Sequence, residues 1–230
     1  MKNKTRDSIV VGFALFSMFF GAGNLIFPPA LGNMLGDKYL LGIVGFVLTG
    51  VGLPLLAILA CSRGNGTFEG ITNKIGVKFT LILTTVLFFA IGPLLAIPRT
   101  AATTFEISIF PFFPNWSPII VMAIYFIINL FFVLRRSSII DTIGKFLTPA
   151  LIIILAIVIV KGVISPIGEI VSTDATNVLS TSLLEGYQTM DALAALLFAG
   201  VITSSIIDKG YKGKEINSVL LKLVLLQLLD

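Results

Sequence analysis

The strongest constraint on this chain is a series of six mostly apolar stretches, each long enough to cross a lipid bilayer. A helix needs about 20 predominantly apolar residues to span the hydrocarbon core. Runs such as LIIILAIVIV are apolar at every position, whereas the strands of a membrane barrel alternate with a period of two. We therefore expect an all-helical, multi-pass membrane protein, with spans at about Ser8–Gly36, Tyr39–Ser62, Phe79–Pro98, within Ile107–Leu134, Ile143–Ile164 and Ser182–Ile207.

Composition supports this interpretation and excludes several classes of function. Apolar residues make up 56% of the chain and charged residues 12%, against roughly 45–50% and 25% in soluble domains. The chain has no histidine and a single cysteine, Cys61. These counts exclude an internal disulfide, a zinc finger, a haem site and a histidine-dependent triad, so we expect neither an enzyme nor a bound cofactor. The net charge of +4 is too small to indicate a nucleic-acid partner.

Lysine and arginine are distributed unequally between the two predicted membrane faces, and this predicts the orientation. Cytoplasmic loops of membrane proteins carry the excess of positive charge. We therefore expect a cytoplasmic N-terminus. One face has Lys38 and Lys161, and the other has Lys2, Lys4, Arg6, Arg63, Lys74, Lys78, Arg135, Arg136, Lys145, Lys209, Lys212 and Lys214.

Two spans contain residues that favour an interrupted helix. Gly21-Ala22-Gly23-Asn24 lies within the first span, and Pro28 and Pro29 follow it. Because glycine costs about 1 kcal/mol and proline about 3 kcal/mol inside a helix, an unbroken helix is costly there. Open backbone at membrane depth must face protein, water, an ion or a substrate. Taken alone, this segment is equally compatible with a kink, with close helix packing and with a binding site.

The sixth span carries Phe198-Ala199-Gly200 and has the opposite orientation to the first. Glycine-interrupted helices at corresponding places in two inverted halves indicate the central site of a transporter. We therefore predict a first five-helix repeat at 1–164, with helix 1 broken at 21–24. A second repeat begins at 165–230, with helix 6 broken near 198–200, and the sequence stops early in a seventh helix.

Three segments, FGAGNLIFPP (20–29), GPLLAIPRTAATTFE (92–106) and EGYQTMDALAALLFAG (185–200), resemble the branched-chain amino-acid transport system II carriers. These are the branched-chain amino acid:cation symporters of bacterial plasma membranes. The resemblance implies import of leucine, isoleucine and valine with sodium or protons. It also implies the leucine-transporter fold of five plus five inverted helices, with alternating access around helices 1 and 6. Two features differ: most of the second repeat is missing, and Phe-Ala-Gly stands where Phe-Gly is expected.

The resemblance and the helix breaks together define a candidate substrate site. Backbone amides at the start of the outer half of helix 1 would hold the substrate carboxylate. Free carbonyls ending near Phe20 and before Phe198 would hold the ammonium, and those two rings would contact the side chain. By analogy with the superfamily, the carbonyls of Ser17 and Phe20 are candidate sodium ligands. The predicted substrate-binding residues are Phe20, Gly21, Ala22, Gly23, Asn24, Phe198, Ala199 and Gly200.

Four polar residues near the predicted breaks allow two interpretations each. Arg99 and Glu106 either extend to the outer membrane interface or form a pair or gate beside the pathway. Asp191 is either a functional intramembrane carboxylate or a residue that caps or pairs within an outer half-helix. Asn24 either binds an ion or caps the outer half of helix 1, and the cap is slightly favoured. A membrane channel or a non-transporting membrane subunit is the alternative function, although no filter motif or ring of like charges is present.

Overall fold

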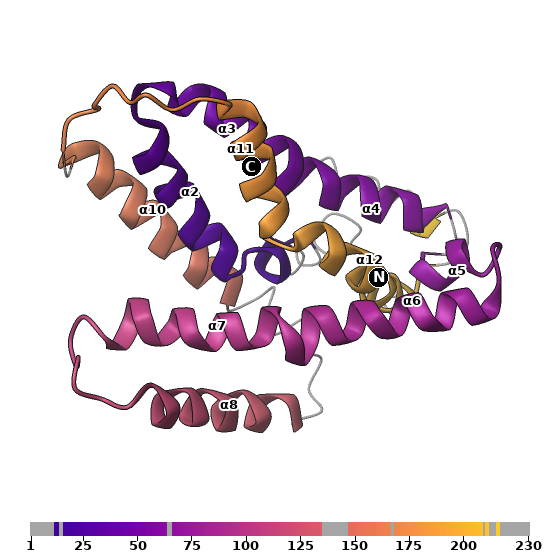
Figure 1. Ribbon diagram of the computed structural model, residues 1–230. Helices are drawn as coiled ribbons and strands as arrows, with labels where there is room; N and C mark the ends of the chain where they lie inside the picture. The colour runs from indigo at the N-terminus through magenta and orange to yellow at the C-terminus, as the bar shows by residue number, and fades with distance from the viewer. Residues whose placement is uncertain are drawn as a thin grey trace.

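Helices form all the regular secondary structure in the described part of the computed structural model. That part covers residues 12–13, 16–63, 66–134, 147–166, 168–208, 210–211 and 215–216. Long helices run back and forth between two ends of the molecule (Figure 1). One end holds the turn between α2 (Ala22–Leu35) and α3 (Tyr39–Val47), the turn between α7 (Ala96–Thr104) and α8 (Pro118–Leu134), and the irregular segment before α11 (Val178–Gln188). The connection from α4 (Leu53–Ser62) through α5 (Phe68–Thr72) to α6 (Val77–Phe89) lies at the opposite end.

The first predicted span is interrupted, although over fewer residues than predicted. Residues 16–19 are helical, Phe20 and Gly21 are not, and α2 (Ala22–Leu35) begins directly afterwards. Pro28 and Pro29 lie inside α2 without ending it. At the end of α2, Gly36 adopts a φ of 54°. A Cβ at Gly36 would collide with the carbonyl of Val171, so this turn requires glycine.

The second and third spans are long helices with local irregularities. The second consists of α3 (Tyr39–Val47), a π-helical segment (Leu48–Gly52) and α4 (Leu53–Ser62). The short helix α5 (Phe68–Thr72) follows. The third consists of α6 (Val77–Phe89), a π-helical segment (Ala90–Leu94) and α7 (Ala96–Thr104), with a further π-helical segment at Phe105–Ile109.

The third helix is distorted where its glycine and proline predict it. Gly92 has a non-helical ψ of −114°, next to Pro93. The helix nevertheless continues past Pro98 to Ile109, and the fourth helix lies within the predicted range of Ile107–Leu134. The fourth helix, α8, covers Pro118–Leu134, because the turn-forming segment 110–117 separates it from the third.

The remaining predicted spans correspond to α10, α11 and α12. The helix α10 covers Thr148–Ile164. Residues 143–146 of the predicted fifth span lie outside the described residues. The sixth span consists of α11 (Val178–Gln188) and α12 (Asp191–Asp208). The predicted seventh helix lies outside the described residues except for 215–216, which are helical.

The sixth span packs against the second along small residues. A Cβ on Gly45 of α3 would lie 2.7 Å from Cβ of Ser182 on α11. A Cβ on Gly186 would overlap the hydroxyl of Thr49 and the carbonyl of Phe46. Small residues let membrane helices approach closely, and here they bring the C-terminal end of α11 against the middle of the second span.

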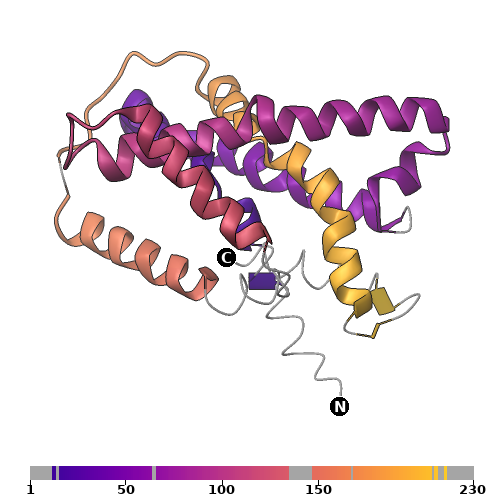
Figure 2. The ribbon, with the colours of Figure 1, turned by 90° about the horizontal axis from the view of Figure 1, so that it is seen from below.

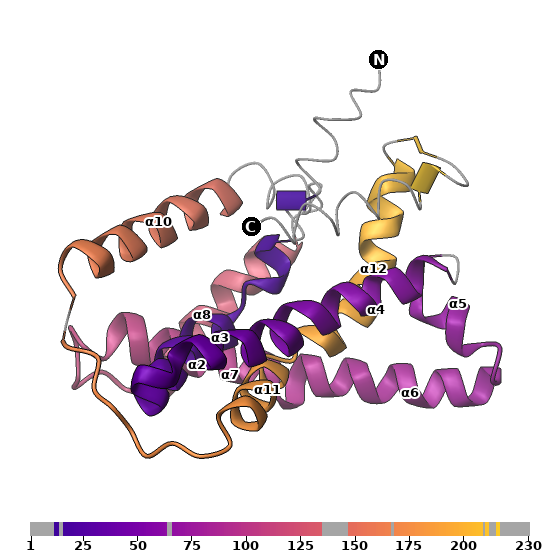
Figure 3. The same ribbon diagram turned by 90° about the horizontal axis from the view of Figure 1, so that it is seen from above.

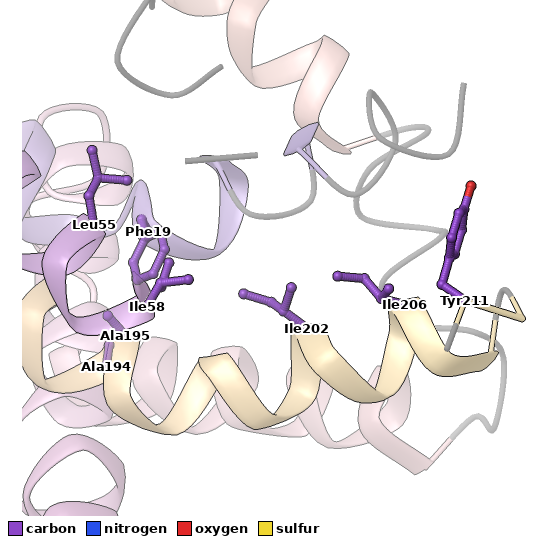
Figure 4. Close-up of a cluster of buried hydrophobic side chains, with 8 residues drawn as sticks. All are labelled: Phe19, Leu55, Ile58, Ala194, Ala195, Ile202, Ile206 and Tyr211. Carbon is purple, nitrogen blue, oxygen red and sulfur yellow. The ribbon is translucent and has the colours of Figure 1, made fainter. Parts of the chain in front are cut away.

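The main apolar cluster continues this contact along α12 (Figure 4). It joins the end of the inner segment of helix 1 to α4 and α12, and its buried members are Phe19, Leu55, Ile58, Ala194, Ala195, Ile202, Ile206 and Tyr211. By contrast, α8 and α10 expose large apolar side chains, including Ile119 and Ile164. In Figures 2 and 3, α10 lies at the opposite end of the molecule from α5.

Helix length and composition identify membrane-spanning elements among the described residues. Three helical stretches are long and apolar enough to cross a bilayer, namely Ala22–Ser62, Val77–Ile109 and Val178–Asp208. The first of these includes the turn at Gly36–Lys38. Pro118–Leu134 and Thr148–Ile164 are shorter apolar helices. The exposed apolar surface and these lengths are those of a helical membrane protein.

Candidate functional site

The sixth span is interrupted at Thr189–Met190, between α11 and α12. Met190 has a φ of 67°, a left-handed conformation that ends a helix and that is unfavourable for a residue with a side chain. The helix α12 continues through residues 198–200, so the predicted break at Phe198-Ala199-Gly200 is wrong. Ala199 is instead buried in a cluster with Cys61 and Phe68. The small residue there serves packing, not an opening of the backbone.

The two interruptions lie against each other. A Cβ built on Gly23, in the first turn of α2, would lie 3.0 Å from Cα of Thr189. The same atom would lie 3.2 Å from the ring of Phe27 and 3.3 Å from Nη2 of Arg99. Gly23 therefore packs closely against the interruption of helix 6. At Gly21, in contrast, such a Cβ would have only the carbonyl of Phe19 within 4.0 Å among the described residues.

Asn24 connects the two interruptions with one side-chain nitrogen. Its Nδ2 donates a 2.6 Å hydrogen bond to the carbonyl of Phe19, the last helical residue before the first interruption. The same nitrogen donates a 2.9 Å hydrogen bond to Oδ2 of Asp191, the first residue of α12. The N-cap of α2 is Gly21, without a side-chain cap. The predicted role of Asn24 as a cap of this helix is therefore wrong, because its amide reaches backwards and across to helix 6.

Asp191 is 8% exposed and lies in the first turn of α12. Its backbone N–H donates to the hydroxyl of Thr189 at 3.4 Å, and its carboxylate accepts from Asn24. The carboxylate of Asp191 is therefore paired, as one of its two interpretations expects. Its partner is Asn24 of helix 1, however, and not a residue of the outer half-helix. The carboxylate thus belongs to the junction between the two interrupted helices.

Arg99 lies at the second interruption. Its Nη1 donates to the carbonyl of Gln188 at 2.8 Å, and its Nη2 donates to the carbonyl of Thr189 at 2.9 Å. The guanidinium carbon is 5.6 Å from the ring centroid of Phe27. Arg99 therefore caps the C-terminal carbonyls of α11, where a cation complements the helix dipole. Glu106 is exposed, and neither of these hydrogen bonds of Arg99 goes to it.

A cavity of about 520 Å³ lies beside this junction. Two polar side chains line it, those of Asn24 and Asp191, in an otherwise apolar wall. Its size and polarity are typical of a pocket for a small molecule with one polar end. The other lining residues are Phe16, Phe19, Phe20, Pro28, Phe46, Val47, Gly50, Val51, Pro54 and Leu55.

The cavity includes some of the predicted site residues and omits others. Phe20 and Asn24 line it, as does Asp191. Gly21, Ala22 and Gly23 adjoin these residues without lining it, and the predicted residues of 198–200 do not line it either. Phe198 packs near Phe19, with ring centroids 5.9 Å apart. Sequence reasoning missed the residues of the second span that line the cavity, because nothing in the sequence distinguishes Phe46 from the other phenylalanines.

The candidate sodium ligands lie next to the cavity. Ser17 belongs to the helical segment 16–19 and is half-buried, and Phe20 lies in the interruption. The described residues contain no cluster of three or more acidic, histidine or cysteine side chains that would hold a metal ion. The assignment of sodium to the backbone carbonyls of Ser17 and Phe20 stays a prediction.

The fold and the cavity define the class of this protein: a helical membrane protein with two interrupted helices that meet at a small, mostly apolar pocket. Comparison with known sequences then gives the family. The profile of the family described as branched-chain amino acid transport protein matches residues 4–228. The chain belongs to this family, as the resemblance noted above implies.

Individual relatives agree with this assignment. The branched-chain amino acid permease BraB of Bacillus subtilis is 39% identical over 212 residues, which are 89% of this chain and 48% of the permease. A branched-chain amino acid carrier protein of Staphylococcus haemolyticus is 39% identical over 217 residues, 90% of this chain and 48% of the carrier. The chain thus spans about half the length of these relatives. No solved structure matches it.

Proposed function

We propose that this chain contributes the substrate site of a secondary carrier that imports leucine, isoleucine and valine across a bacterial plasma membrane. Sodium or protons drive the import by symport, and access to the site alternates between the two faces as helices 1 and 6 move. The N-terminus is cytoplasmic in this proposal, and the five-plus-five inverted repeat is the fold in which the site works. The family and the names of its relatives support the substrate class.

One observation carries the proposal: the contact between the two interrupted helices, through Asn24 and Asp191, at a cavity of about 520 Å³. A branched-chain amino acid has one charged end and one short aliphatic end. The cavity has the matching composition, because Asn24 and Asp191 supply polar groups at the helix junction and the rest of the described lining is apolar. An apolar pocket distinguishes substrates by only about 1–3 kcal/mol per methylene, which suits a carrier for all three.

Gly21, Ala22 and Gly23 supply the remaining part of the proposed site. They lie at the start of α2, where the first backbone amides lack partners within the helix and the dipole favours an anion. A substrate carboxylate bound there would lie next to Phe20 and Asn24. Ser17 and Phe20 are the proposed sodium ligands, and Arg99 and Glu106 the proposed pathway or gate residues, with Arg99 holding the end of α11.

Uptake in proteoliposomes tests this function. The protein, expressed from its complete reading frame, should accumulate labelled leucine only when an inward sodium or proton gradient is imposed. External unlabelled leucine should accelerate efflux of the accumulated label, because a carrier returns faster when loaded. Flux that does not saturate and does not respond to external leucine would contradict the proposal and favour the alternative of a channel. An absence of any leucine flux would favour a non-transporting subunit.

The proposed orientation has its own test. Single cysteines placed in the loops at 63–78 and 135–145 should not react with an impermeant thiol reagent applied to intact cells. A cysteine in place of Lys38, on the opposite face, should react. The reverse pattern would contradict the cytoplasmic N-terminus.

A further inference from the structure

Nδ2 of Asn24 lies at the helix junction in a position that a cation would occupy more favourably than a neutral amide. Nδ2 of Asn24 lies between the carbonyl of Phe19, at 2.6 Å, and Oδ2 of Asp191, at 2.9 Å. One of these acceptors is at the C-terminal end of a helical segment, where the dipole is negative. The other is a carboxylate that is 8% exposed. Both acceptors therefore favour a cation over a neutral amide.

The described residues supply no cation in direct contact with this carboxylate. Arg99 acts on Asp191 electrostatically, but its Nη1 and Nη2 donate to the carbonyls of Gln188 and Thr189. No ion pair of Asp191 is present among the described residues, and Asn24 supplies a hydrogen bond without charge. A charged side chain within a membrane span is costly unless it is paired. Among the described residues, the carboxylate at this junction is therefore hydrogen-bonded by a neutral amide and is not paired with a cation.

We propose that Nδ2 of Asn24 occupies the position of the substrate's α-ammonium group, and that substrate displaces it. This inference rests on the proposed function and names the ammonium subsite within it. An ammonium group has three N–H donors, and two of them would take the acceptors that the amide now uses. The neutral hydrogen bond to Asp191 would become a charge-assisted one, which is roughly twice as strong.

The displacement would also link binding to movement. The hydrogen bond from Asn24 to Asp191 joins α2 to α12, and these two residues are 167 positions apart in the sequence. When the ammonium takes the place of the amide, this direct connection between the interrupted helices is replaced by one through the substrate. The Phe19 carbonyl keeps its other hydrogen bond, from the N–H of Gly21 at 2.9 Å. The inner segment of helix 1 therefore retains its local geometry.

Three probes separate the ammonium from the rest of the substrate. Leucine carries both charges, 3-methylbutylamine carries only the ammonium, and 4-methylpentanoate carries only the carboxylate. Binding of each is measured by calorimetry on the protein from its complete reading frame in lipid nanodiscs. The variants are Asn24→Ala, Asp191→Asn and, as a matched control, Asn129→Ala. The control removes an asparagine amide that donates to the carbonyl of Tyr125 on α8, away from the junction.

Each variant has its own expected result. Asn24→Ala should tighten leucine and 3-methylbutylamine by about tenfold, because removing the competing amide restores roughly the 1–1.5 kcal/mol of one hydrogen bond. Asp191→Asn should weaken both by about 10–100-fold, the loss of a charge-assisted bond. Neither variant should change the affinity for 4-methylpentanoate by more than about twofold, which is well below the change expected from the loss of one such hydrogen bond. Asn129→Ala should match wild type with all three probes.

Other outcomes would overturn the inference. Weaker binding of all three probes in Asn24→Ala would show that the amide is a structural support. Unchanged amine binding in Asp191→Asn, combined with loss of sodium binding, would assign the carboxylate to the coupling ion. If Asn24→Ala does not fold, the contrast between amine and carboxylate probes in Asp191→Asn decides by itself. Failure of wild type to bind leucine would instead contradict the proposed function.

Discussion

The interruptions at Phe20–Gly21 and Thr189–Met190 lie against each other, yet they arise from different residues. The first contains a glycine and precedes two prolines, so local backbone preference contributes to it. The second contains no glycine, and Met190 adopts a left-handed conformation there. Arg99, from the third span, donates to the carbonyls that the second interruption leaves exposed. The comparison shows that one opening is encoded locally, whereas contacts from another helix support the other.

The largest effect is expected where the two interruptions meet. Gly23→Leu should abolish leucine uptake, because even a Cβ at this position would lie 3.0 Å from Cα of Thr189. The matched control is Gly32→Ala, later in α2 and outside the proposed site, where an added Cβ would have no described atom within 4 Å. Uptake by proteoliposomes, at equal amounts of inserted protein, measures both. Equal losses of uptake in the two variants would show that transport depends on the backbone flexibility of glycine and not on the close approach at Gly23.

Replacing Arg99, which donates to the carbonyls at the second interruption, should have the next largest effect. Arg99→Met should destabilise the junction by roughly 2–4 kcal/mol, because two charge-assisted hydrogen bonds to carbonyls are lost. Hydrogen exchange should accelerate at the C-terminal end of α11 more than in residues 16–24. Arg99→Lys should lose less, since an ammonium retains the charge but not the forked geometry. Equal acceleration at both interruptions would show that they open as one unit.

The backbone conformation of Met190 should have a moderate effect. Met190→Val should lower stability by about 1–2 kcal/mol, because a β-branched residue is unfavourable at a positive φ. Met190→Gly should remain within about 1 kcal/mol of wild type, since glycine adopts this conformation freely. Thermal unfolding in detergent gives the order of the two variants. The reverse order would indicate that the side chain of Met190, and not its backbone, determines stability here.

The smallest effect is expected at the glycine where sequence reasoning placed the second break. Gly200 lies inside α12, and in the described part of the chain a Cβ there would meet only Thr67 Cγ2, at 3.7 Å. Gly200→Ala should therefore keep uptake intact and stabilise the helix by up to about 1 kcal/mol. Loss of uptake in this variant, with normal insertion, would show that α12 must open at Gly200 during transport.

Much of the fold was predictable because the membrane imposes simple rules on sequence. The approximate positions of the apolar helices among the described residues follow from apolar length, and the distortion at Gly92 follows from glycine beside proline. The fourth helix lies within the predicted range of Ile107–Leu134, but hydropathy did not determine its first residue, because an apolar turn and an apolar helix have the same hydropathy. The break at Phe198-Ala199-Gly200 was wrong for a related reason, since small residues indicate close helix packing as readily as an opening.

The sequence by itself determined that this chain is helical, that it is a membrane protein, and that its first helix is interrupted. These properties depend on apolar length and on local backbone energies, which a run of residues contains. Only the tertiary structure decided where helix 6 is interrupted, that Arg99 caps it, and that Asn24 joins Phe19 to Asp191. Those contacts join residues up to 167 positions apart, and their energies exist only after the helices have packed together.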